Sequence, residues 1–425
     1  MMDYLPIFIL LALLALNVQV AFAIGIAAIS FFLFSGEMPM QIFVQRFVAS
    51  TQSFPLLAVP FFILTGAIMN EAGITQRMLK LAETLTGHMT GGLGQVNVML
   101  STLLSGMSGS ANADTAMQSK LLVPEMVKQG YDKGFSAALT ASSSVIAVII
   151  PPAIGLVLYG FLGNVSIKDL FMAGIVPGLL LAVAMMITVN IISRRRGYLP
   201  SRATPASWGE RWRAFKGAWL ALLIPVGIIG GIRFGLFTPT EAGAMAVVYT
   251  TIVGLIYGEF TRSSFVTVVK DTVLATAGIM LIICAANALG FYMSWVGIPA
   301  KAASLLIGIS ENPIVILLLL NLLLLVVGMF IEGTALLILL TPILVPVVLQ
   351  LGVDPVHFGI IMVLNLTMGG ITPPLGTLMF VACTITGVSI GKFIKEAIPF
   401  IATLLAVLML LTFVPQISLW LPGLG

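Results

Sequence analysis

The sequence predicts an all-α polytopic membrane protein with inverted repeats, two re-entrant hairpins and two proline-broken helices. Of its 425 residues, 59% are hydrophobic and only 8% are charged, and the mean hydropathy is +1.12. Such a composition excludes a soluble domain. Apolar stretches of about 20 residues, enough to cross a bilayer as a helix, recur along the chain. In addition, residues 106–160 match residues 328–382 at a constant offset and without a gap.

The repeated segment carries its chain-breaking residues at the same places in both copies. The matching positions, all 222 residues apart, are Gly106-Met107 with Gly328-Met329, Leu122-Val123-Pro124 with Leu344-Val345-Pro346, Gly130 and Asp132 with Gly352 and Asp354, and Pro151-Pro152 with Pro373-Pro374. Each copy therefore has a Gly-rich interruption in one apolar stretch and a Pro-Pro interruption in the next. Paired interruptions in the two halves of a membrane protein indicate the binding site of a secondary transporter.

The transmembrane helices are predicted from the apolar runs in chain order. The first run, 5–34, follows an N-terminus without a basic region and is too long for a signal-peptide core, so we expect a retained span. Further spans are expected at 48–70, 134–163, 170–193, 217–236, 240–258, 265–293, 356–383 and 397–421. Two longer, interrupted regions, 92–127 and 312–350, are interpreted as the re-entrant hairpins. Short sloping or interfacial helices are expected at 72–90, 298–310 and 387–396.

The distribution of Lys and Arg predicts the orientation in the membrane. Five segments hold 2, 3, 7, 2 and 2 of these residues, 16 of the 20 in the chain, and the topology puts all five on one side: 71–95, 120–133, 194–216, 259–271 and 392–395. By the positive-inside rule that side is the cytoplasm. The remaining four, Arg46, Lys168, Arg233 and Lys301, are expected on the opposite side of the membrane. The basic loop 194–216 is interpreted as a topology anchor, with contact to lipid or a partner as the alternative.

This topology also orients the termini and the hairpins. The N-terminus is predicted to be cytoplasmic and the C-terminus periplasmic. Hairpin 92–127 opens inward, whereas hairpin 312–350 opens outward, because the extra span 217–236 inverts the second repeat. Inverted repeats are the plan of alternating-access transporters.

The hairpin tips and the proline breaks contain the candidate binding residues. The tips are 105–114 and 328–335, and the breaks lie between Ser142 and Pro152 and between Thr367 and Pro374. Proline frees an upstream carbonyl, half-helix N-termini offer amides to an anion, and half-helix C-termini offer carbonyls to a small cation. Hard cations prefer such oxygen ligands. Two symmetric sets suggest two cation sites flanking one anionic substrate; close packing of small residues is the alternative.

Single polar residues allow more than one interpretation. Asp114 either takes part in binding or caps a half-helix. Glu332 lies in an apolar stretch and is a functional candidate by default, unless it is protonated or hydrogen-bonded to its own hairpin. The two cysteines, Cys284 and Cys383, are typical of small buried hydrophobes. The sequence has no zinc-protease, nucleophile-elbow or phosphate-loop motif, and no feature supports nucleic-acid binding.

The hairpin tips, the Pro-Pro breaks and the sequence Phe237-Thr238-Pro239-Thr240-Glu241-Ala242 resemble the large membrane subunit (DctM-like M-subunit) of tripartite ATP-independent periplasmic (TRAP) transporters. The resemblance runs from Asn17-Val18-Gln19-Val20-Ala21-Phe22 to the last span. It implies an ion-transporter-superfamily fold, like that of the divalent-anion/sodium symporters, with a fixed scaffold and a mobile transport domain that moves as a sodium-driven elevator. It also implies a periplasmic substrate-binding protein and a small four-helix membrane subunit, expected as a separate chain because nothing precedes Met1.

The resemblance divides the chain into five parts. Scaffold helices and the arm of the first repeat occupy 1–90, and the first transport-domain hairpin and broken helix occupy 91–165. Scaffold helices, the basic loop and the second arm occupy 166–311, the second hairpin and broken helix 312–386, and an arm and the last span 387–425. The expected function is Na+-coupled import of a small organic acid, of the sialic acid or C4-dicarboxylate class, across the bacterial inner membrane. An enzymatic activity is not expected.

The resemblance also assigns roles to individual residues. One sodium ion is expected among Ser105, Ser108, Gly109, Asn112, Ser143 and Pro151, and the other among Gly328, Gly333, Thr334, Thr367, Thr372 and Pro373. Substrate is expected to touch Ser108, Ser110, Ser142, Glu332 and Thr334. The first alternative is a stand-alone sodium/carboxylate symporter, which would not need a binding protein. A membrane enzyme would need a convergent acid–base or metal set, and a purely structural scaffold would not need paired broken helices.

Overall fold

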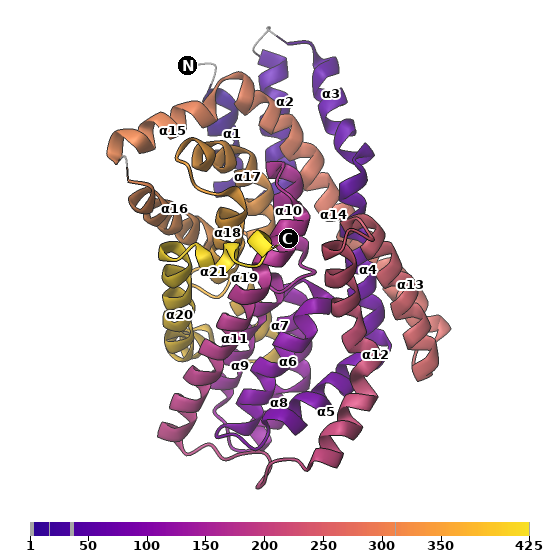
Figure 1. The fold of residues 1–425 in the computed structure, drawn as a ribbon. Helices are drawn as coiled ribbons and strands as arrows, with labels where there is room; N and C mark the ends of the chain where they lie inside the picture. Colours follow the sequence, from indigo (N-terminus) through magenta and orange to yellow (C-terminus); the bar gives the residue numbers. More distant parts are fainter. Residues whose placement is uncertain (1–3, 17, 35–37, 311, 425) are drawn as a thin grey trace.

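The computed structural model describes residues 4–16, 18–34, 38–310 and 312–424; the side chains of Ser108, Arg262 and Ile307 lie outside this description. Every regular element in the described ranges is a helix (Figure 1). Seven described helices are long and apolar enough to cross a membrane. The predicted all-α polytopic membrane protein is therefore confirmed at this level.

The first half of the chain forms mostly short helices and ends with one long helix. In chain order they are α1 (Leu5–Ala15), α2 (Val20–Phe34), α3 (Met40–Ala49), η2 (Ser50–Gln52), η3 (Phe54–Leu57), α4 (Ala58–Glu71), α5 (Ile74–Thr86), α6 (Gly92–Ser108), α7 (Ala111–Leu121), α8 (Val123–Lys128), α9 (Lys133–Ser143), η4 (Ser144–Val148), α10 (Ile154–Gly163) and α11 (Ile167–Arg196).

The second half begins with three long helices. Its elements are α12 (Trp208–Arg233), α13 (Pro239–Tyr257), α14 (Arg262–Trp295), α15 (Ile298–Ile309), α16 (Pro313–Gly328), α17 (Gly333–Gln350), α18 (Pro355–Gly369), α19 (Thr377–Thr386), α20 (Ile390–Phe413), α21 (Gln416–Leu419) and η5 (Pro422–Leu424).

Helix boundaries recur at nearly the same spacing as the sequence match. The helices α16, α17, α18, α19 and α20 start 221 to 223 residues after α6, α7, α9, α10 and α11, respectively. Matching side chains cause part of this agreement. Asp132 accepts hydrogen bonds from the backbone amides of Gly134 and Phe135 at the start of α9, and Asp354 does the same for Val356 and His357 at the start of α18. A carboxylate in this position fixes where a helix begins.

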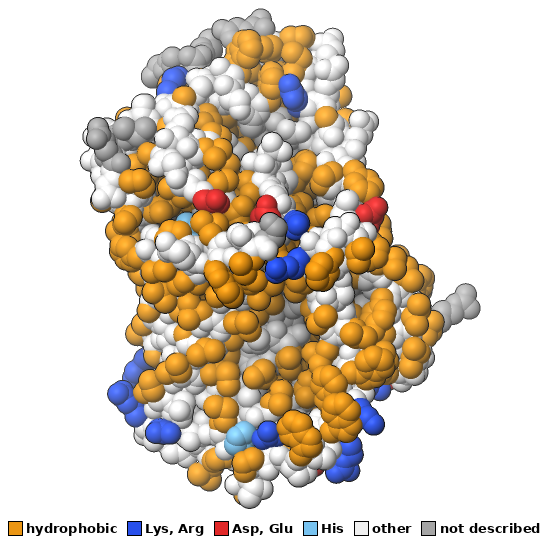
Figure 2. All heavy atoms as spheres, in the orientation of Figure 1, with side chains coloured by type: hydrophobic (Ala, Val, Ile, Leu, Met, Phe, Trp, Pro, Cys, Tyr) orange, Lys and Arg blue, Asp and Glu red, His pale blue; other side chains and the backbone are white. Residues whose placement is uncertain are grey.

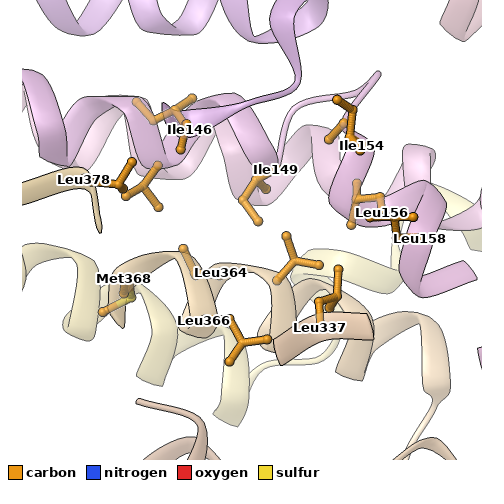
Figure 3. Packing of buried hydrophobic residues seen from close by; sticks show 14 of the residues in the cluster. Ile146, Ile149, Ile154, Leu156, Leu158, Leu337, Leu364, Leu366, Met368 and Leu378 are labelled. Atoms are coloured by element: carbon orange, nitrogen blue, oxygen red, sulfur yellow. The ribbon is translucent and has the colours of Figure 1, made fainter. Parts of the chain in front are cut away.

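The two helix pairs that correspond to the predicted hairpins approach each other from opposite ends of the molecule. The pair α6–α7 lies in the lower half of Figure 1, and the pair α16–α17 lies in the upper half. Buried apolar residues after η4 and on α17 and α18 pack together in the core, among them Ile149, Leu337 and Leu364 (Figure 3). The core therefore holds the two turns, 109–110 and 329–332, near the centre of the molecule.

The predicted single span 5–34 is wrong. The structure has two shorter helices there, α1 and α2, which pack side by side. The apolar run is interrupted at Asn17-Val18-Gln19, and amide side chains compete with helical backbone hydrogen bonds. Tyr4, at the start of α1, receives a hydrogen bond from Lys301 Nζ at 3.2 Å. The start of α1 therefore lies at the same end of the molecule as Lys301, which the charge count assigns to the outside, whereas the topology assigns the N-terminus to the cytoplasm.

Lys and Arg gather at the lower end of the face in Figure 2, below a wide hydrophobic zone. This basic end includes the end of α11 and the beginning of α12 (Figure 1). The predicted loop 194–216 is shorter than expected, because α12 begins at Trp208 with a capping box between Ser207 and Glu210. The side of the membrane that each end faces stays a prediction.

Two further boundaries differ from the sequence prediction. The expected interfacial helix 387–396 and span 397–421 are one continuous helix, α20, which ends at Phe413. Pro415 follows two residues later, and proline cannot donate the next helical hydrogen bond. The helix α3 was not predicted; it is an amphipathic helix without buried residues.

Candidate functional site

The two hairpin turns and the two proline breaks line one pocket with a volume of about 110 Å³. The lining residues from the turns are Gly109, Ser110, Ala111, Asn112, Glu332, Gly333 and Thr334. Those from the broken helices include Val148, Ile154, Gly155, Thr367, Gly370, Thr377 and Leu378. Segments that are far apart in the sequence therefore meet at one place in the core.

Four helix N-termini converge on this pocket. The lining includes the first residues of α7 (Ala111), α10 (Ile154), α17 (Gly333) and α19 (Thr377). Each N-terminus carries unpaired amides and a partial positive charge. No Lys or Arg is among the described residues of the lining. The positive potential that an anion would meet here therefore comes from the backbone.

Glu332 caps the helix of its own hairpin. Its Oε2 accepts a hydrogen bond from the backbone amide of Ala335 at 2.9 Å, and its Oε1 accepts one from Thr334 Oγ1 at 2.8 Å. Of the interpretations open from the sequence, the structure therefore favours the hydrogen-bonded one. The carboxylate remains half-buried and lines the pocket, so it also adds a negative charge there.

The second turn packs directly on the broken helix α18. A Cβ atom added to Gly328 or Gly333 would lie 3.3 or 3.2 Å from the carbonyl oxygen of Leu366. The backbone amide of Leu375 donates to the carbonyl of Met329 at 3.1 Å. This close backbone packing explains why the turn needs glycine. It also brings the Leu366 carbonyl within reach of the turn.

Hydroxyl groups of the second break retain free acceptor capacity. Thr367 Oγ1 donates to the carbonyl of Val363 at 2.7 Å, and Thr372 Oγ1 donates to that of Met368 at 2.8 Å. A hydroxyl has one donor and two lone pairs, so each oxygen can still accept a bond or coordinate a cation. Thr367 lines the pocket, whereas Gly328, Thr372 and Pro373 do not.

The first turn packs in a similar way on the first break. Gly109 has a left-handed φ of +56° and ends α6; an added Cβ would lie 2.8 Å from the carbonyl oxygen of Pro152. Ser110 caps α7 by accepting from the amide of Ala113 at 3.4 Å. Asn112 Oδ1 is buried and has no hydrogen-bond partner in the described part of the protein. The prediction for Ser108 lies outside the described side chains.

The remaining predicted residues of the first half lie behind the pocket. Ser105 is buried and donates to the carbonyl of Thr102 at 2.6 Å. Ser143 donates to Asn97 Oδ1 at 2.8 Å. Ser142 Oγ is buried without a partner among the described atoms. Neither these serines nor Pro151 belongs to the pocket lining.

A buried polar cluster surrounds Asp114, beside the first turn. The Asp114 carboxylate accepts from Ser101 Oγ and from Gln118 Nε2, both at 2.9 Å. Ser101 Oγ also lies 3.1 Å from Ser143 Oγ, and Ser143 donates to Asn97, which connects the cluster to Asn97. No described Lys or Arg forms an ion pair with Asp114. Asn97, Ser101 and Gln118 were not predicted from the sequence, although the i, i+4 spacing of Asn97 with Ser101 and of Asp114 with Gln118 indicates side chains on one helix face.

The pocket thus joins seven of the predicted residues: Gly109, Ser110, Asn112, Glu332, Gly333, Thr334 and Thr367. No three His, Cys, Asp or Glu side chains of the described ranges come together as metal ligands. Cys284 and Cys383 are both buried free thiols. The chemistry that this arrangement supports is binding through backbone amides, carbonyls and hydroxyls.

Two solved transporter structures have a similar fold. The Alcanivorax borkumensis YdaH transporter superposes with a TM-score of 0.64 at 16% identity, and the match covers 89% of both chains. Neisseria gonorrhoeae MtrF superposes with a TM-score of 0.58 at 13% identity and covers 90% of this chain and 84% of that one. At these identities the likeness concerns the fold alone.

Sequence relatives are much closer. The sialic acid TRAP transporter large permease protein SiaM of Vibrio cholerae is 41% identical over 97% of both chains. The isethionate TRAP transporter permease protein DctMQ of Oleidesulfovibrio alaskensis is 39% identical over 96% of this chain and 65% of that longer one. The C4-dicarboxylate TRAP transporter large permease protein DctM of Rhodobacter capsulatus is 34% identical over 98% of both.

The family model of the "Tripartite ATP-independent periplasmic transporter, DctM component" matches residues 7–417. The relatives are permease proteins of transporters, and the resemblance seen at the hairpin tips and Pro-Pro breaks is confirmed. The chain therefore belongs to the DctM component family, the large permease subunits of TRAP transporters, and it is a transport protein and not an enzyme.

Proposed function

We propose that this chain imports a small organic acid together with Na+ across the bacterial inner membrane, as the transport subunit of a TRAP system. The observation that carries the proposal is the convergence of four helix N-termini on one pocket between the two hairpin turns. Backbone amides at helix N-termini bind carboxylates without a dedicated basic residue. The pocket is therefore suited to an organic anion.

The charge balance of the same pocket supports the proposed sodium coupling. Its lining contains the carboxylate of Glu332 and no described basic side chain. A second negative charge brought in by the substrate would be costly in a partly buried site unless a cation enters with it. A co-bound cation removes that cost, so anion binding and cation binding become mutually dependent.

The contacts between turns and breaks supply the proposed cation ligands. At the second turn, the Leu366 carbonyl faces Gly328 and Gly333; at the first, the Pro152 carbonyl faces Gly109. Unwound backbone carbonyls and helix C-termini are the usual sodium ligands of transporters with broken helices. The buried Asn112 Oδ1 adds an unsatisfied acceptor. We place one Na+ at each contact, with substrate between them.

The transport movement we propose is an elevator. In this scheme the pairs α6–α7 and α16–α17, with the broken helices α9–α10 and α18–α19, form the transport domain of two inverted repeats. The recurring helix boundaries support the repeats. Tight packing of each turn on its own broken helix supports movement of these segments as one body. The two helix pairs are the proposed re-entrant hairpins.

Membership of the family implies a small membrane subunit and a periplasmic binding protein as partners. We propose that the small subunit is a separate four-helix chain that braces the scaffold, and that the binding protein delivers the substrate. The relatives are named for sialic acid, isethionate and C4-dicarboxylate systems. Among these acids we favour a sialic acid, which the most similar of the three relatives is named for.

Uptake into proteoliposomes tests the proposal. The chain and its small partner are reconstituted, and uptake of labelled sialic acid or C4-dicarboxylate is measured with and without an inward sodium gradient and with and without the binding protein. We expect uptake only when both are present. Sodium-driven uptake without the binding protein would indicate the stand-alone symporter instead. Uptake at the same rate with and without the sodium gradient would contradict sodium coupling.

A further inference from the structure

A second hollow lies at the basic end of the molecule, between α5 and α12, and its volume is about 420 Å³. From α5 it is lined by Arg77, Lys80 and Thr84, which are spaced three and four residues apart and so share one helix face. The loop contributes Arg202, and α12 contributes Glu210, Arg213, Ala214 and Gly217, again on one face. These residues define the basic hollow.

The basic hollow has an excess of positive charge. Four of its lining side chains are cationic and one is acidic. Arg202 is paired with Glu210 at 2.8 Å, and Arg77 is paired with Glu259 at 3.0 Å and lies over the ring of Tyr257. In the described ranges no carboxylate pairs with Lys80 or Arg213. Two cations therefore face one space without a protein counter-ion.

The floor of the hollow leaves room for a ligand. Gly217 has no atom within 4 Å of where its Cβ would be, and the neighbouring lining residue on α12 is Ala214. The buried Thr84 also belongs to the lining, and its hydroxyl donates to the carbonyl of Leu81 at 2.8 Å. The loop wall is held in place, because Ser201 Oγ and the amide of Arg202 both donate to the carbonyl of Gly87 at 3.1 Å. The hollow is thus a formed feature with cations around it.

An exposed aromatic stripe runs along α12 on the face opposite to the one that lines the basic hollow. Trp212 and Phe215 stack with ring centroids 5.5 Å apart, and Trp219 follows on the same exposed side. At 3.6 residues per turn, this side is about half a turn away from Arg213 and Gly217. The helix α12 is one of the candidate membrane spans, and tryptophans at the end of a span mark the headgroup region. Trp212 is next to Arg213 in the chain, so the basic hollow lies at headgroup depth.

We propose that the basic hollow binds the phosphate group of an anionic phospholipid from the adjacent leaflet. Basic pockets between membrane helices on the cytoplasmic side bind anionic headgroups, and the tryptophans of α12 put the hollow at headgroup depth. A free phosphate would use the same cations but has no acyl chains to anchor it in the bilayer. The bound headgroup bridges α5 and α12, and it therefore stabilises the contact between these two helices.

The test measures lipid binding to the purified, delipidated full-length chain in mild detergent, by native mass spectrometry and by the shift of the unfolding temperature. The probes are phosphatidylglycerol, phosphatidylcholine and inorganic phosphate. We expect phosphatidylglycerol to bind roughly tenfold more tightly than phosphatidylcholine. Stabilisation by inorganic phosphate equal to that by phosphatidylglycerol would overturn the assignment to a lipid, as would equal binding of the two lipids.

Two matched double variants test whether the lipid binds in the basic hollow. The double variant Lys80→Gln/Arg213→Gln leaves both ion pairs of the hollow intact and should remove the preference for phosphatidylglycerol. Its control, Arg194→Gln/Arg195→Gln, removes the same charge from exposed residues at the same end and should keep the preference. Equal losses in both would indicate diffuse attraction and overturn the site.

A second pair of variants changes the volume of one side chain but not its charge. Gly217→Leu fills the hollow and should weaken phosphatidylglycerol binding, whereas Gly230→Leu on the same helix, also in open space, should not. Leucine is a better helix former than glycine, so both variants should fold. Unchanged phosphatidylglycerol binding in Gly217→Leu would overturn the proposal.

Discussion

Gly369 lies against the backbone of Gly328 so closely that a methyl group on Gly369 would come within 2.5 Å of the Gly328 carbonyl carbon. The two glycines end α18 and α16, so this contact joins the second hairpin to its broken helix. It is the closest of the turn-to-break contacts around the pocket. A Cβ on Gly328 would lie 3.4 Å from the Cα of Gly369, so the contact excludes a side chain more strictly at Gly369 than at Gly328.

We therefore expect Gly369→Ala to separate the second turn from α18. Overpacking of a tight contact typically costs about 1–3 kcal/mol, and the displaced Leu366 carbonyl would no longer face the turn. Thermal unfolding should show a lower midpoint, and sodium-dependent uptake should be lost. Gly278→Ala in α14, where no atom lies within 4 Å, is the control. Normal uptake by Gly369→Ala would show that the contact is dispensable.

Thr334→Leu should abolish uptake without preventing membrane insertion. The pocket holds only about 110 Å³, and leucine both fills it and removes the hydroxyl that donates to Glu332. Thr334→Ser keeps the hydroxyl and should retain most of the uptake. Thr267→Leu, at an exposed position, controls for the substitution itself. Sodium-driven uptake by Thr334→Leu at the wild-type rate would exclude Thr334 from the site.

Asp114→Ala should destabilise the protein strongly. It leaves one N–H of Gln118 Nε2 without its acceptor and takes the carboxylate away from Ser101 Oγ, and a buried unsatisfied group costs about 1–3 kcal/mol. Asp114→Asn keeps the size of the side chain and one acceptor, so the loss should be smaller. Asp271→Ala, at an exposed position, should leave the unfolding midpoint unchanged. Equal midpoints for Asp114→Ala and wild type would show that the cluster does not support the fold.

The ion pair between Asp132 Oδ2 and Lys392 Nζ, 2.7 Å long, should make stability depend on pH. Burial alone would raise the pKa of Asp132, but the hydrogen bond from Lys392 and the backbone amides of Phe135 and Gly134 together lower it. A carboxyl with a lowered folded-state pKa stabilises the protein above its ordinary pKa of about 3.9, and this contribution disappears as the pH falls through the folded-state value.

The variant Asp132→Asn tests this dependence. Its unfolding midpoint should lie below that of wild type at about pH 7, and the difference should shrink below about pH 4. The control is Asp354→Asn, which alters the corresponding helix cap where no described Lys or Arg is paired. A difference of the same size at both pH values would show that the ion pair has no part in it.

The turns of the two helix pairs and the breaks between the helices that follow could be located from the sequence because glycine and proline act locally. No helix runs through Pro151-Pro152 or Pro373-Pro374, and Asp132 and Asp354 cap the helices that follow them. The break between α1 and α2 was missed, because hydropathy averages over Asn17-Val18-Gln19. The cluster of Asn97, Ser101 and Gln118 was also missed, because its members join helices that meet only in the folded chain.

By itself, the sequence determined that this protein is an all-α membrane protein, that its chain-breaking residues recur at one offset and that its helices are interrupted near Gly109 and Gly333. These properties depend on composition and on local backbone preferences. Only the tertiary structure decided that Glu332 caps its own hairpin, that seven of the predicted residues share one pocket while Ser142 and Ser143 lie behind it, and that Lys80 and Arg213 face one hollow. Which residues meet depends on how helices pack, and packing is set by contacts between distant segments.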